Sequence, residues 1–187
     1  APATAKGSTF FLSGTTAGAL GAGKRGNGSL RGHMKAVVQR VSKARVTVAG
    51  EETGAIERGL FVLLGVGAAD GPEDADLLAG RIPVMRIFPN EAGKLDRSLA
   101  DVGGGLLAVS QFTLYGDTSK GRRPSFTDAA LPEKAVPLYE RFVAKVAEQG
   151  IRTATGRFGA DMQIELVADG PVTILLDSSS VRKTASA

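Results

Sequence analysis

The chain has 187 residues, a formal net charge of +4, no cysteine, and one histidine, His33. Because that histidine lies in the N-terminal segment, the body of the chain cannot form a disulfide, a thiolate or imidazole zinc site, or a Ser-His-Asp or Cys-His catalytic group. We therefore expect neither a metal nor a cofactor, and no apolar run is long enough to span a bilayer.

Residues 1–33 carry the whole net charge. They contain four of the 23 basic residues and none of the 19 acidic ones, so the rest of the chain has 19 of each. This Gly-, Ala-, Ser- and Thr-rich segment is predicted to be a disordered leader, either an organelle transit peptide or an expression leader ending at His33-Met34. A neutral body argues against binding DNA or long RNA through phosphates, and leaves room for a small contact with an RNA end.

The first half of the body begins with β-branched runs. Residues 36–41 and 44–48 are predicted to be two short strands separated from the next element by a turn at 49–51. Residues 59–66 form a continuous apolar run between glycines, which predicts a strand buried on both faces. A helix follows from Pro72, and Pro83 should end or kink it before a strand at 84–88.

The second half alternates in the same way. We predict a strand at 106–115, a helix at 132–149 that stops at Gly150, and strands at 162–167 and 172–176 on either side of a Gly-Pro turn signal. Residues 34–178 thus form one domain, and residues 179–187 are predicted to be a flexible polar tail. The chain contains no internal repeat.

Two short motifs about sixty residues apart carry the most information. They are Ser110-Gln111-Phe112-Thr113-Leu114-Tyr115 and Asp169-Gly170-Pro171-Val172-Thr173. Together with Gln39-Arg40-Val41, Gly93-Lys94-Leu95, Arg123-Pro124-Ser125-Phe126 and Phe158-Gly159-Ala160-Asp161-Met162, they resemble the D-aminoacyl-tRNA deacylases from Met34 to about Ser178. The resemblance implies a homodimer with a mixed α/β fold, made of two β-sheets or a partial barrel flanked by two helices.

The resemblance also assigns roles to the first motif. It implies that Ser110, Gln111, Phe112 and Thr113 line a pocket for the terminal adenosine of a tRNA and its aminoacyl group, with Phe158 and Met162 as further walls. From the pattern alone, Thr113 is a strand former, Gln111 a buried amide with partners, and the two wall residues belong to the core. A regular strand would not place Ser110 and Thr113 together without a bulge or a strand end.

The second motif is implied to act across the dimer. In the family the Gly170-Pro171 bond is cis and enters the active site of the other subunit, where backbone oxygens hold the substrate ammonium and exclude L side chains. Arg40 is implied to steady this dipeptide. From the pattern alone, Gly170-Pro171 is an ordinary hairpin turn and Arg40 is a charge on an edge strand.

A basic loop follows the first motif. Lys120, Arg122 and Arg123 are placed to meet phosphates of the acceptor end, although such a run is usually just a solvated loop. The sequence departs from the family pattern at three positions. Gly116 stands where alanine is common, Ala168 where asparagine often precedes Asp-Gly-Pro, and Pro83 interrupts a usually helical stretch.

The predicted reaction is hydrolysis of the ester in D-aminoacyl-tRNA, and in glycyl-tRNA mischarged on tRNA(Ala). Its partners are the aminoacylated 3′ acceptor end and a second copy of the chain. Without an imidazole, the 2′-hydroxyl of the terminal ribose is expected to help activate water, with Thr113 as a covalent nucleophile the alternative. Two other functions stay open: a non-catalytic nucleic-acid-binding or replication-associated module, and an L-specific synthetase-type editing domain. The expected location is the cytoplasm, or a plastid or mitochondrion if residues 1–33 are a transit peptide.

Overall fold

The computed structural model describes residues 33–185. Apart from His33, the predicted leader therefore lies outside the described residues, as does the end of the predicted tail. Within this part of the chain the order is β1 (Lys35–Val48), β2 (Glu51–Ile56), β3 (Gly59–Gly65), α1 (Pro72–Arg81), β4 (Phe88–Pro89), β5 (Leu95–Arg97), β6 (Gly105–Ser110), the short 3-10 helix η1 (Phe112–Tyr115), α2 (Pro132–Ala147), β7 (Thr153–Thr155), β8 (Gln163–Asp177) and α3 (Ser178–Ala185). None of these helices is long and apolar enough to cross a bilayer.

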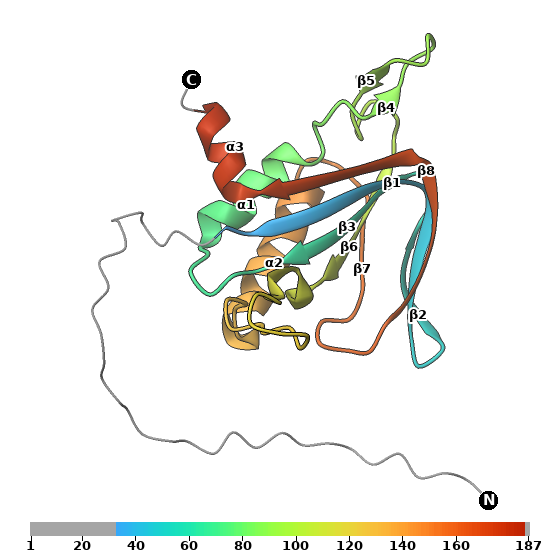
Figure 1. The fold of residues 1–187 in the computed structure, drawn as a ribbon. Helices are drawn as coiled ribbons and strands as arrows, with labels where there is room; N and C mark the ends of the chain where they lie inside the picture. Colours follow the sequence, from blue (N-terminus) through green and yellow to red (C-terminus); the bar gives the residue numbers. More distant parts are fainter. Residues whose placement is uncertain (1–32, 186–187) are drawn as a thin grey trace, which may run out of the picture.

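One six-stranded sheet organises the fold, and β1 is its central strand. Along one edge β1 pairs with β3 through its first half and with β2 through its second half, while β8 pairs with β1 along the other edge. The parallel strands β6 and β7 continue the sheet from β3. Figure 1 shows β1 and β8 running side by side over most of their length.

The sheet curls until it is nearly closed. A Cβ atom on Gly54 of β2 would lie 2.4 Å from the backbone oxygen of Thr155 in β7, so the two end strands meet at this point. Gly59 and Gly105 allow a similar close approach of β3 to β6. The predicted mixed α/β fold with a partial barrel is confirmed, and a second sheet of β4 and β5 forms an arm that projects from it.

Two apolar clusters fill the structure. The smaller one lies inside the curl and includes Val41, Val46, Phe61 and Leu107. The larger one packs one face of the sheet against α1 and α2, and it includes Leu60, Leu78, Phe88, Leu106 and Phe142. Complete burial of such side chains contributes about 1.5–3 kcal/mol each to folding. The predicted helices, the buried strand at β3 and the effect of Pro83 are confirmed.

Outside the first motif, three predictions about strands are wrong. The segments at 36–41 and 44–48 form one strand, because β8 pairs with β1 across the irregular register between Gln39 and Lys43. Likewise, β8 is a single strand that runs through Gly170-Pro171, so this dipeptide is not a hairpin turn. Residues 84–87 are not a strand, since only Phe88–Pro89 pairs with β5.

The predicted flexible tail is also wrong for the residues that the structure describes, because α3 covers 178–185. Buried contacts anchor its start. The Ser178 hydroxyl donates to Asp74 Oδ1 at 2.6 Å and accepts from the Met34 backbone amide at 3.1 Å. The Asp177 carboxylate accepts the backbone amide of Ser180 at 2.8 Å, which satisfies a free amide of the first turn. The helix lies beside α1 in Figure 1.

Candidate functional site

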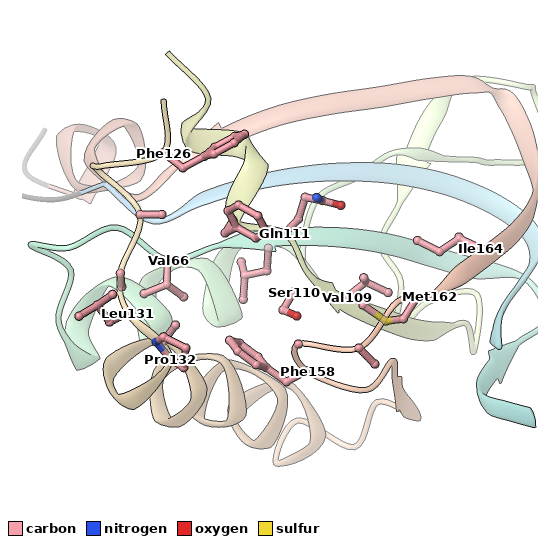
Figure 2. A pocket seen from close by; sticks show the side chains of 17 residues that line it. Val66, Val109, Ser110, Gln111, Phe126, Leu131, Pro132, Phe158, Met162 and Ile164 are labelled. Atoms are coloured by element: carbon pink, nitrogen blue, oxygen red, sulfur yellow. The ribbon is translucent and has the colours of Figure 1, made fainter. Parts of the chain in front are cut away.

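A cavity of about 550 Å³ opens where β6 ends. Its walls come from the end of β6, η1, the segment 126–132, the start of α2 and the segment 158–164. In Figure 2, Ser110 and Gln111 lie between Phe126 on one side and Phe158 on the other. None of the 17 lining residues carries a titratable side chain, so the cavity is apolar with a few hydroxyl and amide groups.

The first motif leaves the sheet inside this cavity. Strand β6 ends at Ser110, and the prediction of a strand to Tyr115 is wrong because residues 112–115 turn into η1. The backbone amide of Gln111 still donates to the Leu64 carbonyl of β3 at 2.8 Å. The backbone amide of Gly116 donates to the Thr113 carbonyl at 3.0 Å and closes the turn. The strand end therefore provides the break in regular geometry that the predicted site requires.

Three of the four predicted catalytic residues line the cavity, namely Ser110, Gln111 and Phe112. Thr113 is exposed and lies at its margin, where its hydroxyl accepts a hydrogen bond from Gln111 Nε2 at 2.5 Å. The first amides of a 3-10 helix have no acceptor within the helix, which leaves the Phe112 and Thr113 amides available at the same margin.

Aromatic residues form the upper and lower walls. Phe112 is 57% exposed and meets Phe126 edge to face, with 5.0 Å between ring centroids. Phe126 was not predicted as a site residue, although it ends one of the recognised motifs. On the opposite side, Phe158 packs edge to face on buried Tyr139 at 6.0 Å.

Met162 lies at the far side of the cavity and lines it. Its position depends on Gly156, a residue that sequence reasoning missed. A Cβ atom at Gly156 would lie 2.5 Å from Met162 Sδ, so any larger residue would move the methionine. The only signal in the sequence is that this glycine stands two residues before Phe158.

The second motif lies elsewhere in the same chain, because neither Gly170 nor Pro171 lines the cavity. The peptide bond between them is cis and both residues are exposed. Arg40 contacts the residue that precedes Gly170. Its Nε donates to the Asp169 carbonyl at 3.0 Å and pairs with the Asp169 carboxylate at 3.0 Å, while Nη1 donates to the Ile87 carbonyl at 2.6 Å.

Arg40 is only 6% exposed, so the sequence interpretation of a solvent-exposed edge charge is wrong. Its guanidinium also lies over the ring of Phe88, 6.0 Å from the centroid. A buried guanidinium charge is costly unless hydrogen-bond acceptors surround it, and here the carbonyl oxygens of Asp169 and Ile87 and the Asp169 carboxylate do so. The planar set of donors allows one guanidinium to reach several oxygens at once. The same guanidinium fills the space beside Gly170, where a Cβ atom would approach Nη2 to 3.0 Å.

The basic loop lies beside the upper wall. The backbones of Asp117 and Ser125 exchange two hydrogen bonds of 2.8 Å, and this pair closes the loop directly between η1 and Phe126. Lys120, Arg122 and Arg123 are exposed within it, and none of them takes part in the ion pairs found among residues 33–185. Among the same residues, no three His, Cys, Asp or Glu side chains come together to hold a metal ion.

Comparison with known proteins gives one consistent result. A family model described as D-Tyr-tRNA(Tyr) deacylase matches residues 37–177. A D-aminoacyl-tRNA deacylase from Koribacter versatilis (strain Ellin345) is 61% identical over 145 residues, covering 78% of this chain and 97% of that protein. One from Anaeromyxobacter dehalogenans (strain 2CP-C) is 59% identical over 145 residues, with the same coverage.

Solved structures are similar as well, and two of them are described. The first is a c-Myc DNA Unwinding Element Binding Protein, with a TM-score of 0.71 and 41% identity, covering 76% of this chain and 97% of that one. The second is a probable eukaryotic D-amino acid tRNA deacylase, with a TM-score of 0.70 and coverage of 78% of this chain and 99% of that one. At 18% identity, this second likeness supports the fold alone.

Proposed function

The chain belongs to the D-Tyr-tRNA(Tyr) deacylase family, and from this premise we propose that it hydrolyses the ester bond between a D-amino acid and its tRNA. It is a hydrolase acting on ester bonds. The observation that carries the proposal is the cavity at the end of β6, where the Ser110-Gln111-Phe112 edge meets the Phe158 and Met162 wall. An apolar cavity of this size suits an aminoacyl group with part of the terminal nucleoside.

The side chains around the cavity favour a reaction without a protein base. Because no lining residue is titratable, the free 2′-hydroxyl of the terminal ribose is proposed to help activate the water. Amides at the start of η1, near Phe112 and Thr113, would stabilise the developing oxyanion. The Thr113 hydroxyl is engaged by Gln111, which supports a positioning role for it over a nucleophilic one.

Selection against L-amino acids is proposed to come from Gly170 and Pro171 of a second subunit. These residues do not line the cavity of their own chain, yet they are exposed and held rigidly by Arg40. Two backbone oxygens from this segment would accept hydrogen bonds from the substrate ammonium, so that an L side chain collides with the backbone and a D side chain points away. Glycine has no side chain to collide, so glycyl-tRNA should also be hydrolysed.

A homodimer is supported by the exposed surface of β8. This strand pairs with β1 along one edge only, and its apolar side chains Ile164, Val167 and Leu175 are 37%, 48% and 76% exposed. A long edge strand with exposed apolar residues is usually covered in a stable protein. A second copy placed there would also carry its own Gly170-Pro171 toward this region.

The direct test is hydrolysis of D-Tyr-tRNA, L-Tyr-tRNA and Gly-tRNA side by side. We expect rapid loss of the D-tyrosyl and glycyl esters and stability of the L-tyrosyl ester. Equal rates for the D and L esters would contradict the chiral selection, and no hydrolysis of either would contradict the proposed activity.

The cross-subunit site has its own test. Heterodimers of a Gly170→Ala subunit and a Thr113→Ala subunit should contain one unaltered composite site and one doubly altered site. Their activity should therefore exceed the mean of the two parent homodimers. Activity equal to that mean would show that each site is built within one chain.

The basic loop is proposed to contact phosphates of the acceptor end. Replacing Lys120, Arg122 and Arg123 by alanine should slow hydrolysis of D-Tyr-tRNA and flatten its salt dependence, because fewer counterions are released. Hydrolysis of D-tyrosyl adenosine, which lacks those phosphates, should stay unchanged. Equal losses on both substrates would place the loop in the reaction itself.

A DNA-binding role is the second candidate, favoured by the 41% identical structure named for binding a DNA unwinding element. The equal numbers of basic and acidic residues from Met34 onward argue against it, as does an apolar cavity that no double helix would enter. Binding of a DNA duplex at physiological salt, together with no deacylation, would favour this role over the first.

A further inference from the structure

The catalytic turn η1 is attached from behind by one buried side chain. Tyr115 is 9% exposed, and it does not line the cavity. Its ring fits a slot at the end of β3 that two glycines leave open. A Cβ atom on Gly65 would lie 3.0 Å from Tyr115 Cε2, and one on Gly67 would lie 3.0 Å from the Tyr115 hydroxyl.

The tyrosine hydroxyl reaches a buried carboxyl group in this slot. It lies 3.3 Å from Asp70 Oδ2 and 2.7 Å from the His33 carbonyl oxygen. Lys35 holds the same turn from β1, since its Nζ donates to the Leu114 carbonyl at 3.1 Å and lies 4.4 Å from the centre of the Tyr115 ring. The end of β3, the lysine on β1 and the buried Asp70 thus all contact a turn of only four residues.

Asp70 also fixes the segment that carries the slot. It is 2% exposed, its Oδ2 accepts the Gly67 amide at 2.6 Å, and its own amide donates to the Gly67 carbonyl at 3.1 Å. Its other oxygen, Oδ1, has no hydrogen-bond partner among the described residues. Burial of a carboxyl group with one unsatisfied oxygen destabilises the fold, so we expect Asp70 to serve the function of the protein and not its stability.

The same segment also holds a second stretch of the cavity wall, residues 128–130. The Ala68 amide donates to the Asp128 carbonyl at 2.9 Å, and the Ala130 amide donates to the Val66 carbonyl at 2.9 Å. Ala129 and Ala130 line the cavity, as does Phe112 of η1. Residues 64–70 therefore connect both walls, one through Tyr115 and one through this backbone pairing.

We propose that Tyr115 and Asp70 are positioning residues that hold η1 at a fixed distance from the 128–130 wall, and so set the geometry in which Gln111 and Thr113 meet the ester. The inference rests on the proposed function. Neither side chain touches the cavity, so both act through the turn. A small displacement of positioning groups is enough to slow a reaction strongly.

The test compares two tyrosine-to-phenylalanine variants. Tyr115→Phe keeps the ring in its slot and removes the hydroxyl contacts with Asp70 and with the His33 carbonyl oxygen. The control is Tyr139→Phe, which removes an equally buried hydroxyl bond, 2.9 Å to the Ala108 carbonyl, away from η1. We expect Tyr115→Phe to lower kcat for D-Tyr-tRNA about tenfold with KM little changed, and the control to keep its kcat while its melting temperature falls as much.

Lys35→Met is the second variant, because it removes the bond to the Leu114 carbonyl from a half-buried position and leaves the buried tyrosine unchanged. It should also lower kcat with little change in KM. A kcat within twofold of the unaltered protein for both Tyr115→Phe and Lys35→Met would overturn the inference, as would an equal fall in kcat for Tyr139→Phe. If the unaltered protein itself fails to hydrolyse D-Tyr-tRNA, the proposed function fails, which is a separate result.

Discussion

The two motif regions are held in opposite ways. The turn η1 faces its own cavity, and the slot beside Gly65 and Gly67, the Lys35 ammonium and the buried Asp70 carboxyl group fix it on its other side. The Gly170-Pro171 segment faces outward, away from that cavity, and one buried arginine fixes it. The difference suggests that the turn is complete within one chain, whereas the Gly-Pro segment is built to be presented to another. Four changes can break or sharpen this comparison.

Arg40→Ala should have the largest effect, because this side chain makes the side-chain contacts that hold Asp169 next to Gly170. The change leaves the Ile87 and Asp169 carbonyl oxygens without their donor and removes a buried charge. We expect the free energy of unfolding to fall by about 3 kcal/mol. Chemical denaturation measures this fall, and hydrolysis of D-Tyr-tRNA should fall with it.

Arg40→Lys is the matched control. A lysine keeps the charge but cannot reach both carbonyl groups with a planar set of donors, so it should recover part of the stability and little of the activity. Full recovery of activity by lysine would mean that charge, and not the shape of the guanidinium, supports Gly170.

Gly170→Ala should come next, with a stronger effect on activity than on stability. The glycine has a φ of +131°, and an added Cβ atom would lie 2.9 Å from Val172 Cγ2 and 3.0 Å from Arg40 Nη2. We expect a fall in kcat/KM of about a hundredfold for D-Tyr-tRNA, or about 2.7 kcal/mol of transition-state stabilisation. Steady-state kinetics measures it.

Gly50→Ala provides the comparison for that change. Gly50 has a φ of +84° in the turn between β1 and β2, and no heavy atom lies within 4 Å of the position of an added Cβ. It shares the left-handed backbone and lacks the crowding. If both alanine variants lose activity equally, backbone conformation and not the close approach at Gly170 explains the loss.

Thr113→Ala should have a moderate effect. Its hydroxyl is proposed to position Gln111 and the substrate, so removal should lower kcat about tenfold, or about 1.4 kcal/mol, without abolishing hydrolysis. Thr113→Ser keeps the hydroxyl and should retain most of the activity. A covalent aminoacyl adduct trapped on Thr113 would show that the residue is a nucleophile instead.

Local patterns predicted the parts of the fold that local chemistry decides. Pro72 and Pro83 set the limits of α1, and Gly150 follows the end of α2 with a φ of +78°. The resemblance directed attention to the Ser110 and Gly170 motifs, whose roles stay predictions. Cavity residues Ser110, Gln111, Phe112, Phe158 and Met162 were predicted and lie together.

Contacts between distant residues decided the rest. The apolar pattern continues past Ser110, and the strand ends there because Tyr115 enters the slot beside Gly65 and Gly67. Gly170-Pro171 stays within β8 because Arg40, 129 residues earlier, holds Asp169. α3 begins at Ser178 because that hydroxyl reaches Asp74, 104 residues earlier. No single-sequence pattern contains such pairings.

Asp70→Asn should have the smallest effect. The dependence of its melting temperature on pH tests the buried support of η1. Burial, as the main cause, and the nearby Asp74 raise the pKa of Asp70, while the Gly67 amide, the Tyr115 hydroxyl and Lys134 oppose that shift. A raised pKa means that the folded chain binds this proton more tightly than the unfolded chain does. The stability gained from it is present below the ordinary carboxyl pKa of about 3.9, and it is lost as the pH rises through the folded-state pKa.

Asp70→Asn removes this titration, so the melting temperature of the variant relative to the unaltered protein should rise between about pH 4 and pH 7. Asp76→Asn is the control with the opposite sign, because the Arg141 guanidinium lowers the pKa of Asp76 and stabilises its charged form. The melting temperature of that variant relative to the unaltered protein should fall as the pH rises towards the ordinary carboxyl pKa of about 3.9, and should stay level at higher pH, where the charged Asp76 is already fully stabilised. The fall should be slight, since the pair is partly exposed. A flat difference for Asp70→Asn would mean that Asp70 titrates as it does in the unfolded chain. The carboxyl group behind η1 would then carry no cost of burial, and the inner support of η1 would not differ in this way from the buried Arg40 guanidinium, which is fully paired.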